Sequence, residues 1–162
     1  MFTDTHCHLD FPELSGNIES LLSACADNKI HQIIVPSVSP KNWQDVLQLA
    51  KQSSNSGCAI FSALGIHPWY LDELSNDVLI SLEELMTQQN DYIIAVGETG
   101  IDGKIAEQKS NLQQQIYFFE YHIELAKKFQ LPLIIHHRKS HQHIMPLLKH
   151  HTVDRKGVIH AF

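Results

Sequence analysis

Short apolar runs rich in β-branched residues recur along the chain and alternate with segments of helical periodicity. Near-continuous hydrophobicity of this kind is typical of parallel β-strands that are covered on both faces. Strands that alternate with helices predict repeated βα units and therefore an α/β fold. The six expected strands are FTDTHCH at 2–8, QIIVPS at 32–37, CAIFSALGI at 58–66, YIIAVGE at 92–98, LPLIIHH at 131–137 and GVIHAF at 157–162.

Helical patterns occupy the segments between these runs. Ser39 followed by Pro40 is a capping residue with proline at the first helical position, which opens one helix. Pro146 should shorten or kink the last helix. A stripe of apolar side chains marks the longest one, at Leu112, Ile116, Phe119, Ile123 and Ala126. The expected helices cover residues 18–29, 40–52, 77–89, 107–129 and 141–150.

The architecture follows from this alternation. The length of 162 residues, 43% of them hydrophobic, allows a buried core and indicates one domain, residues 1–162. Two architectures fit, a doubly wound sheet and a (β/α) barrel. A GxGxxG fingerprint after the first strand would favour the doubly wound sheet. The sequence has His6-Cys7-His8 there instead.

Composition narrows the class of protein. No run of 18 apolar residues predicts a membrane span, and no signal peptide is visible at the start. Cys7, Cys25 and Cys58 are an odd number without CxxC spacing, which fits reduced thiols in a cytoplasmic protein. We expect each of them to fill space as a small buried hydrophobe.

The charge is unevenly distributed. A net charge of −6 argues against a dedicated nucleic-acid binder. Residues 121–162 nevertheless carry seven Lys or Arg side chains, opposed only by Glu124 and Asp154. This bias indicates either a basic face for a phosphate-bearing substrate or ordinary solvated helix faces.

Two histidines lie two residues apart near the N-terminus. Because a strand turns its side chains to alternate faces, His6 and His8 should project from one face and Cys7 from the other. Two neutral imidazoles side by side suit a metal ion better than an apolar core. The alternative is a pair of surface histidines near a terminus.

The ends of the strands carry most of the other candidate ligands. In parallel α/β folds, ligands bind at the carboxyl ends of the strands. Five of the six expected strands end in a histidine or a carboxylate, whereas the second ends at Pro36-Ser37 without one. A carboxylate beside the apolar YIIAV run would be costly to bury without a cation. The candidates, enough for one divalent metal or for two with a bridging carboxylate, are His6, His8, His67, Glu98, His136 and His160.

The remaining histidines are weaker candidates. His137 neighbours His136 and should face the other way along its strand. Those on expected helices or loops are predicted to be surface residues, namely His31, His122, His141, His143, His150 and His151.

Five motifs follow one another along the whole chain. They are Asp4-Thr5-His6-Cys7-His8, Gly65-Ile66-His67-Pro68, Gly97-Glu98-Thr99-Gly100-Ile101-Asp102, Leu131-Pro132 through His136-His137-Arg138, and Gly157-Val158-Ile159-His160-Ala161-Phe162. Together they resemble the motifs of the TatD-type metal-dependent deoxyribonuclease and hydrolase family. The opening HCHLDFP and the second-strand IIVPS are most similar to the YjjV-like subgroup of that family.

The resemblance implies a TIM-type (β/α) barrel and a site with two divalent metal ions, Mg²⁺, Mn²⁺ or Zn²⁺. Carried over position by position, it makes His6 and His8 ligands of one metal and Glu98 the bridge between both. It assigns His136 and His160 to the second metal. It places His67 and Arg138 near the substrate phosphate, so Glu98, His67 and Arg138 are the implied catalytic residues.

The sequence departs from the family pattern in one respect. The family has a further aspartate ligand at the end of a later strand, which also orients the attacking water. Nothing here corresponds to it, because the sequence stops at Phe162 after about six of the eight βα units of a barrel. We therefore expect a truncated member with an incomplete barrel, whose first and last strands are open edges that favour self-association.

The resemblance implies hydrolysis of DNA or another phosphodiester by metal-activated water, with activity impaired by the truncation. Two alternatives remain open. The chain could be a catalytically inert remnant, or an amidohydrolase acting on another small ester or amide. The ligand set does not separate these functions.

Overall fold

The structure, a computed structural model, describes residues 1–52, 57–72, 74–152 and 155–160. Six strands form one sheet in sequential order, and every neighbouring pair is parallel. The strands are β1 (Phe2–Asp4), β2 (Ile30–Pro36), β3 (Ala59–Leu64), β4 (Ile93–Asp102), β5 (Leu133–Arg138) and β6 (Val158–His160). This order confirms the predicted βα repeats and excludes a doubly wound sheet, in which the strand order reverses.

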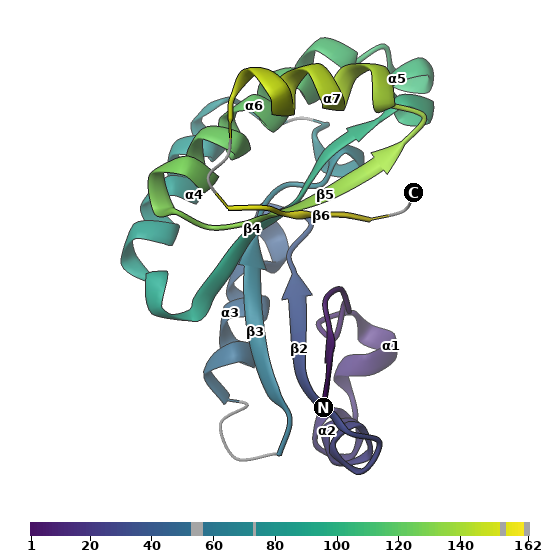
Figure 1. The fold of residues 1–162 in the computed structure, drawn as a ribbon, viewed down its shortest axis with the longest axis vertical. Coiled ribbons are helices and arrows are strands. Elements are labelled where there is room, and N and C mark those ends of the chain that lie inside the picture. Colours follow the sequence, from purple (N-terminus) through teal and green to yellow (C-terminus); the bar gives the residue numbers. More distant parts are fainter. Residues whose placement is uncertain (53–56, 73, 153–154, 161–162) are drawn as a thin grey trace.

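The sheet curls as the sheet of a TIM-type barrel does. Figure 1 shows β2 and β3 running nearly vertically, whereas β5 and β6 run across the view. Helices α4 to α7 gather on one side of the curled sheet, near β4 to β6. The part of the chain that the structure describes thus contains six of the eight strands of such a barrel, and helices follow the first five.

The helices cover the outside of this sheet. Four of them lie close to the bounds expected from the sequence, and α7 runs through Pro146 without ending there. The helices are α1 (Pro12–Ser15), α2 (Ile18–Asp27), α3 (Trp43–Gln52), α4 (Asp77–Gln88), α5 (Gly103–Lys109), α6 (Leu112–Phe129) and α7 (His141–His150). Short 3₁₀ turns are η1 (Pro40–Asn42), η3 (Pro68–Tyr70) and η4 (Asn90–Tyr92).

The prediction of one helix over residues 107–129 was wrong. The chain forms α5 and then α6, with a break at Ser110, whose φ of 53° is left-handed. The Asp102 side chain accepts a hydrogen bond from the Ile105 amide, so the first helix begins earlier than expected. The apolar stripe predicted for this region lies within α6 and packs against the core.

The first strand is shorter than predicted. It ends at Asp4, whose side chain accepts a hydrogen bond from the His6 amide. His6 and His8 therefore lie on the segment after the strand rather than on the strand itself. The alternation still holds there, because the Cys7 amide donates to the Ile34 carbonyl and the Cys7 side chain packs against the core.

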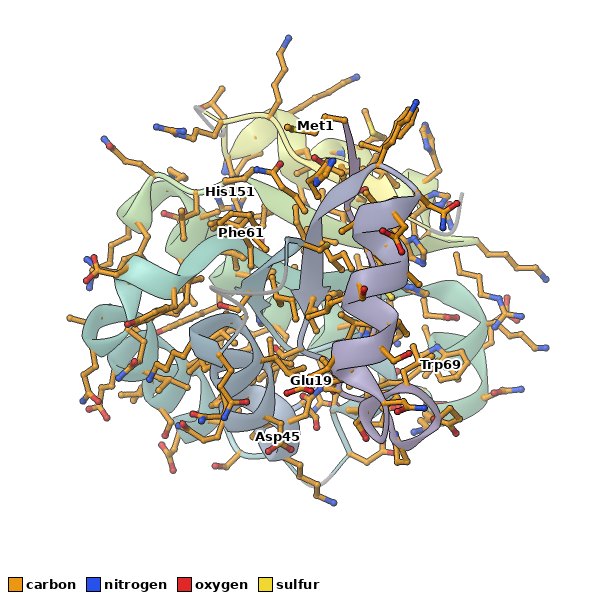
Figure 2. All side chains as sticks on the ribbon, turned by 90° about the horizontal axis from the view of Figure 1, so that it is seen from below. Met1, Glu19, Asp45, Phe61, Trp69 and His151 are labelled. Atoms are coloured by element: carbon orange, nitrogen blue, oxygen red, sulfur yellow. The ribbon has the colours of Figure 1, made fainter. Side chains whose placement is uncertain are left out.

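The core lies between the helices and the sheet. The largest fully buried side chains include Phe118 and Phe119 of α6, Leu64 of β3 and Ile101 of β4. Long polar side chains project outward around the periphery (Figure 2). The last two residues of the expected strand 157–162, Ala161 and Phe162, lie outside the described residues, as does Asp154. Among the helices that the structure describes, none is both long and apolar enough to cross a membrane.

Candidate metal centre

Glu98 is the centre of a cluster of imidazoles. It lies on β4, 2% exposed, and each of its carboxylate oxygens faces two histidines. Oε2 lies 3.1 Å from Nε2 of His6 and 3.5 Å from Nε2 of His8. Oε1 lies 3.2 Å from Nδ1 of His136 and 3.5 Å from Nε2 of His67. The carboxyl ends of β1, β3, β4 and β5 thus converge on one carboxylate, as strand-end reasoning expects.

The surroundings of Glu98 favour its charged form. Burial by itself raises the pKa of this carboxyl. The close imidazoles of His136, His6 and His8 outweigh burial and hold the pKa of this carboxyl far below its usual value. Glu98 is therefore an anion at neutral pH, although it has almost no contact with solvent.

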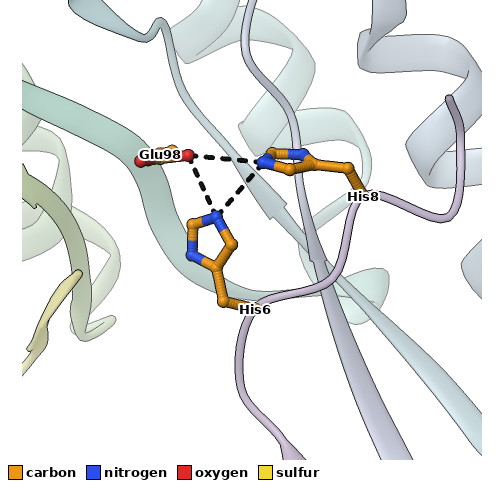
Figure 3. Close-up of side chains that lie close together, drawn as sticks. All are labelled: His6, His8 and Glu98. Carbon is orange, nitrogen blue, oxygen red and sulfur yellow. Dashed lines mark hydrogen bonds and ion pairs between the residues drawn. The ribbon is translucent and has the colours of Figure 1, made fainter. Parts of the chain in front are cut away.

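One ligand atom from each of His6, His8 and Glu98 lies close to the other two (Figure 3). The Nε2 atoms of the two histidines are 3.2 Å apart, and both face Oε2 of Glu98. A tetrahedral ion with bonds of about 2.05 Å holds neighbouring ligand atoms about 3.3 Å apart. The three observed spacings of 3.1, 3.2 and 3.5 Å bracket that value, so the geometry fits a divalent ion.

The hydrogen bonds of His8 support the same conclusion. Its Nδ1 lies 3.2 Å from the Pro36 carbonyl, which can only accept, so the proton of the neutral ring is on Nδ1. Its Nε2 lone pair therefore faces the Glu98 carboxylate, and a positive group has to lie beside these two acceptors. The Nε2–H of His6 can serve, and a divalent cation in place of that proton would serve more strongly.

His67 has the opposite arrangement. Its Nδ1 accepts a hydrogen bond from the Trp69 amide at 3.1 Å, and this contact begins η3. Burial is the main reason that the pKa of His67 is lowered to about 3, so the ring is neutral and carries its proton on Nε2. By spacing, His67, Glu98 and His136 could also hold a metal. The tautomer instead makes His67 a hydrogen-bond donor that points towards Glu98.

His136 lies between two carboxylates. Its Nδ1 faces Glu98, and its Nε2 lies 3.0 Å from Oδ2 of Asp102, which is fully buried. Asp102 belongs to a motif quoted above, but sequence reasoning gave it no role. The signal was present, because an acidic residue that ends an apolar strand needs a partner for the same reason as Glu98.

Asp102 remains charged for reasons like those at Glu98. Burial by itself raises the pKa of this carboxyl. The hydrogen bonds from the Trp69 indole, the Ile105 amide and His136 outweigh burial and lower it. Arg138 adds a weaker contact, 3.9 Å from Oδ2, and its side chain is 42% exposed. Arg138 therefore lies beside Asp102.

His160, on the edge strand β6, lies against His6 and lines the same cavity as Glu98 and His136. Its ring stacks on that of His6, with centroids 3.8 Å apart and planes 10° from parallel. Among the described residues, neither group with metal-ligand spacing includes it. Burial and the nearby His6 lower the pKa of His160, so the ring is neutral at neutral pH.

The second strand contributes through its backbone. The sequence offers no ligand at Pro36-Ser37, yet the Ser37 carbonyl accepts the Glu98 amide at 3.0 Å. Together with the hydrogen bond that the Pro36 carbonyl accepts from His8, this contact fixes two of the metal-ligand candidates.

The prediction that His122 is a surface residue was wrong. It is fully buried on α6, where Nδ1 donates to the Phe118 carbonyl and Nε2 accepts from the Ile66 amide. It therefore supports the segment that carries His67. The remaining histidines expected at the surface are exposed or half-buried.

The cluster opens into a cavity of about 210 Å³. One side of it is polar and includes five of the candidate residues. The other side is lined by Val38 and by Trp69 and Tyr70, each 45% exposed. The polar lining residues are His8, His67, Glu98, His136 and His160.

Comparison with known proteins agrees with this picture. The metal-dependent hydrolase YjjV of Escherichia coli K12 is 35% identical over 161 residues, which are 99% of this chain and 60% of YjjV. The crystal structure of YjjV, a TatD homologue, superposes with a TM-score of 0.90 over the same shares of both chains. A protein of Erwinia amylovora named 3'-5' ssDNA/RNA exonuclease TatD is 25% identical, over 98% of this chain and 59% of its own length.

The chain thus spans about 60% of the length of the relatives that it matches. The match to a protein family covers residues 3–162, from the first strand to the last residue. The curled sheet, the sequential strand order and the histidines around Glu98 all lie within that match. The chain belongs to the family of TatD related DNases.

Proposed function

We propose that this chain forms the metal-binding part of a hydrolase that cleaves phosphodiester bonds of DNA or of a related substrate. The observation that carries this proposal is the convergence of His6 and His8 on one oxygen of a buried, charged Glu98. Activation of a water molecule and neutralisation of charge on a phosphate are what a divalent cation supplies in such a site.

The two oxygens of Glu98 face two different groups of metal-ligand candidates. His6 and His8 would hold one cation together with Oε2. His136 would present Nδ1 to a second cation beside Oε1, and His160 would complete that position as the family resemblance implies. Glu98 would then be the bridge between the two.

The groups next to the cavity suit a phosphate-bearing substrate. The Nε2–H of His67 is a neutral donor that can bind a phosphate oxygen without a change of protonation. Arg138 supplies a partly exposed guanidinium close to the same ligands. Trp69 and Tyr70 offer exposed ring faces at the rim, on which a nucleobase could stack.

The first test is metal binding. Isothermal titration with Mn²⁺, Zn²⁺ and Mg²⁺ should show saturable binding to the wild-type chain. Glu98→Gln removes the shared charge and should weaken Mn²⁺ binding at least tenfold. Glu84→Gln, at an exposed position of α4, is the matched control and should leave it unchanged. Equal binding by both variants would remove Glu98 from the site.

The second test is the substrate class. Single-stranded DNA, single-stranded RNA, a chromogenic phosphodiester and a chromogenic acyl ester are offered with each metal. Phosphodiester cleavage that disappears in Glu98→Gln supports the proposal. Turnover of the acyl ester alone would assign the chain to an amidohydrolase activity, and metal binding without any turnover would identify an inert remnant.

A further inference from the structure

Asp102 is a buried carboxylate that the proposed chemistry does not use. It is fully buried at the end of β4, and four groups surround its two oxygens. Oδ1 accepts from the Ile105 amide at 2.9 Å, which caps α5. Oδ2 accepts from the Trp69 indole at 2.7 Å and lies 3.0 Å from His136 Nε2, with Arg138 at 3.9 Å.

The cap on α5 does not require a carboxylate. Asparagine caps helices as well as aspartate does, and only Oδ1 takes part in the cap. Oδ2 faces the Trp69 N–H, His136 Nε2 and the guanidinium, all of which are donors or can become donors. The cap on α5 therefore does not explain the contacts of Oδ2.

The imidazole of His136 has two nitrogens and two carboxylate neighbours. Only Nδ1 faces Glu98, so only Nδ1 can reach a cation shared with that residue. A neutral imidazole offers Nδ1 as a lone pair only when its proton is on Nε2. Asp102 is the acceptor placed at Nε2, 3.0 Å away.

We propose that Asp102 is a positioning residue, which holds the proton of His136 on Nε2 and so presents the Nδ1 lone pair to a metal ion beside Glu98. The oxygen that does this also anchors the Trp69 ring at the rim of the cavity. One carboxylate thus positions both the metal ligand His136 and the Trp69 ring that lines the cavity. Loss of such an outer partner typically costs about 10- to 100-fold in metal affinity.

The inference rests on the proposed metal-binding role of His136, and the two are tested by different measurements. Long-range ¹H–¹⁵N correlation spectra at a fixed pH of 8 report which imidazole nitrogen carries a proton. The His136 signals are assigned by their loss in His136→Gln. In the wild-type chain, Nε2 should be protonated both without metal and with Zn²⁺. An unprotonated Nε2 would overturn the inference, whether or not the chain binds metal.

Two variants separate positioning from packing. Asp102→Asn keeps the oxygen that caps α5 but places an NH₂ group opposite His136 Nε2, so the proton should move to Nδ1. Its affinity for Mn²⁺ should fall about 10- to 100-fold. Trp69→Phe is the matched control, because it removes the other contact to the same oxygen and leaves Asp102 facing His136. It should keep the wild-type tautomer and an affinity within about threefold of wild type.

The outcomes of these variants are distinct. Equal loss of affinity in Asp102→Asn and Trp69→Phe would make Asp102 a packing residue and overturn the inference. An unchanged tautomer in a folded Asp102→Asn would overturn it as well. If Asp102→Asn does not fold, the wild-type spectrum still decides. Absence of metal binding by the wild-type chain would instead reject the proposed function while the tautomer result stands.

Discussion

Burial keeps His122 and His67 neutral, and both rings accept hydrogen bonds from the same stretch of backbone. His122 accepts a hydrogen bond from the Ile66 amide, and the neighbouring His67 accepts one from the Trp69 amide. Burial lowers the pKa of His122 to about 4 and that of His67 to about 3. Each ring is therefore an uncharged hydrogen-bonding group at neutral pH.

The burial of His122 predicts a pH dependence of stability. The unfolded chain binds a proton at this residue near its ordinary pKa of 6.5, whereas the folded chain does so only near 4. Its contribution is therefore complete above pH 6.5. It is lost as the pH falls from 6.5 towards 4, at about 1.4 kcal/mol per unit for one proton.

Replacement of the ring isolates this effect. His122→Gln should be about 2 kcal/mol less stable than wild type at pH 7.5, because buried hydrogen bonds are disturbed. The difference should shrink to near zero by pH 5, as wild type loses its own advantage. Urea unfolding at pH 7.5, 6 and 5 measures this, with His150→Gln on the exposed part of α7 as the control. A difference that stays constant with pH would contradict the assignment.

Sequence reasoning found polar side chains near the ends of the strands, but it could not determine imidazole tautomers or the residues that contact these side chains from other elements. Glu98 and His136 stood out because polar side chains at the ends of apolar runs need partners. His122 was missed although it follows the buried Phe118 and Phe119 at helical spacing. A pattern that scores histidine as polar hides such a position, because the hydrogen bonds that make its burial possible come from other elements.

The close approach of β4 and β5 places His136 beside Glu98. Gly100 has a φ of 137°, and a Cβ built there would lie 2.2 Å from the His136 carbonyl oxygen. Gly100 and His136 are also register partners in the sheet. A side chain at position 100 would therefore strain the backbone and push the strand that carries the ligand.

This geometry predicts a selective effect of one methyl group. Gly100→Ala should lower the free energy of unfolding by at least about 1–3 kcal/mol and weaken Mn²⁺ binding together with it. Gly16→Ala is the matched control, since it has ordinary helical φ and ψ and open space around it. The control should be neutral or about 0.4–1 kcal/mol more stable. Similar losses of stability in both variants would show that position 100 is no more constrained than position 16.

Hydrophobic periodicity predicts that a helix is present more accurately than it predicts where the helix begins and ends. The stripe from Leu112 to Ala126 predicted α6 correctly, because burial of one face sets its period. The separate helix α5 depends on a side-chain cap by Asp102 and a left-handed Ser110, and neither changes the apolar pattern. The first strand ended early for a similar local reason, the bond from the His6 amide to Asp4.

At the scale of the whole molecule, the described part of the chain forms six strands of a barrel-type sheet, and the chain spans about 60% of the length of YjjV. The family resemblance places a further aspartate ligand on a later strand, and the relatives extend beyond the matched region. We expect turnover of single-stranded DNA by this chain at least about 100-fold below that of a full-length relative, by analogy with the loss of one preorganised group. Side-by-side assays with Mn²⁺ test this, and equal rates would show that the six strands present here suffice.

The two ends of the sheet predict how this chain behaves in solution. Within the part of the chain that the structure describes, β1 pairs only with β2 and β6 only with β5. Phe2 on β1 is 65% exposed and Val158 on β6 is 40% exposed. Unpaired backbone groups beside apolar side chains are a template for pairing with another chain. We expect self-association through these edges at concentrations of tens of micromolar.

Sedimentation velocity over a concentration series measures the association. Val158→Lys places a charge on the β6 edge and should shift the chain towards monomer, because a buried lysine would oppose edge pairing. Ile80→Lys is the control, since Ile80 is 53% exposed on α4 and away from both sheet edges. A wild-type chain that remains monomeric throughout the series would rule out edge pairing. An equal effect of both lysines would instead attribute the association to general surface hydrophobicity, because only the first variant changes a sheet edge.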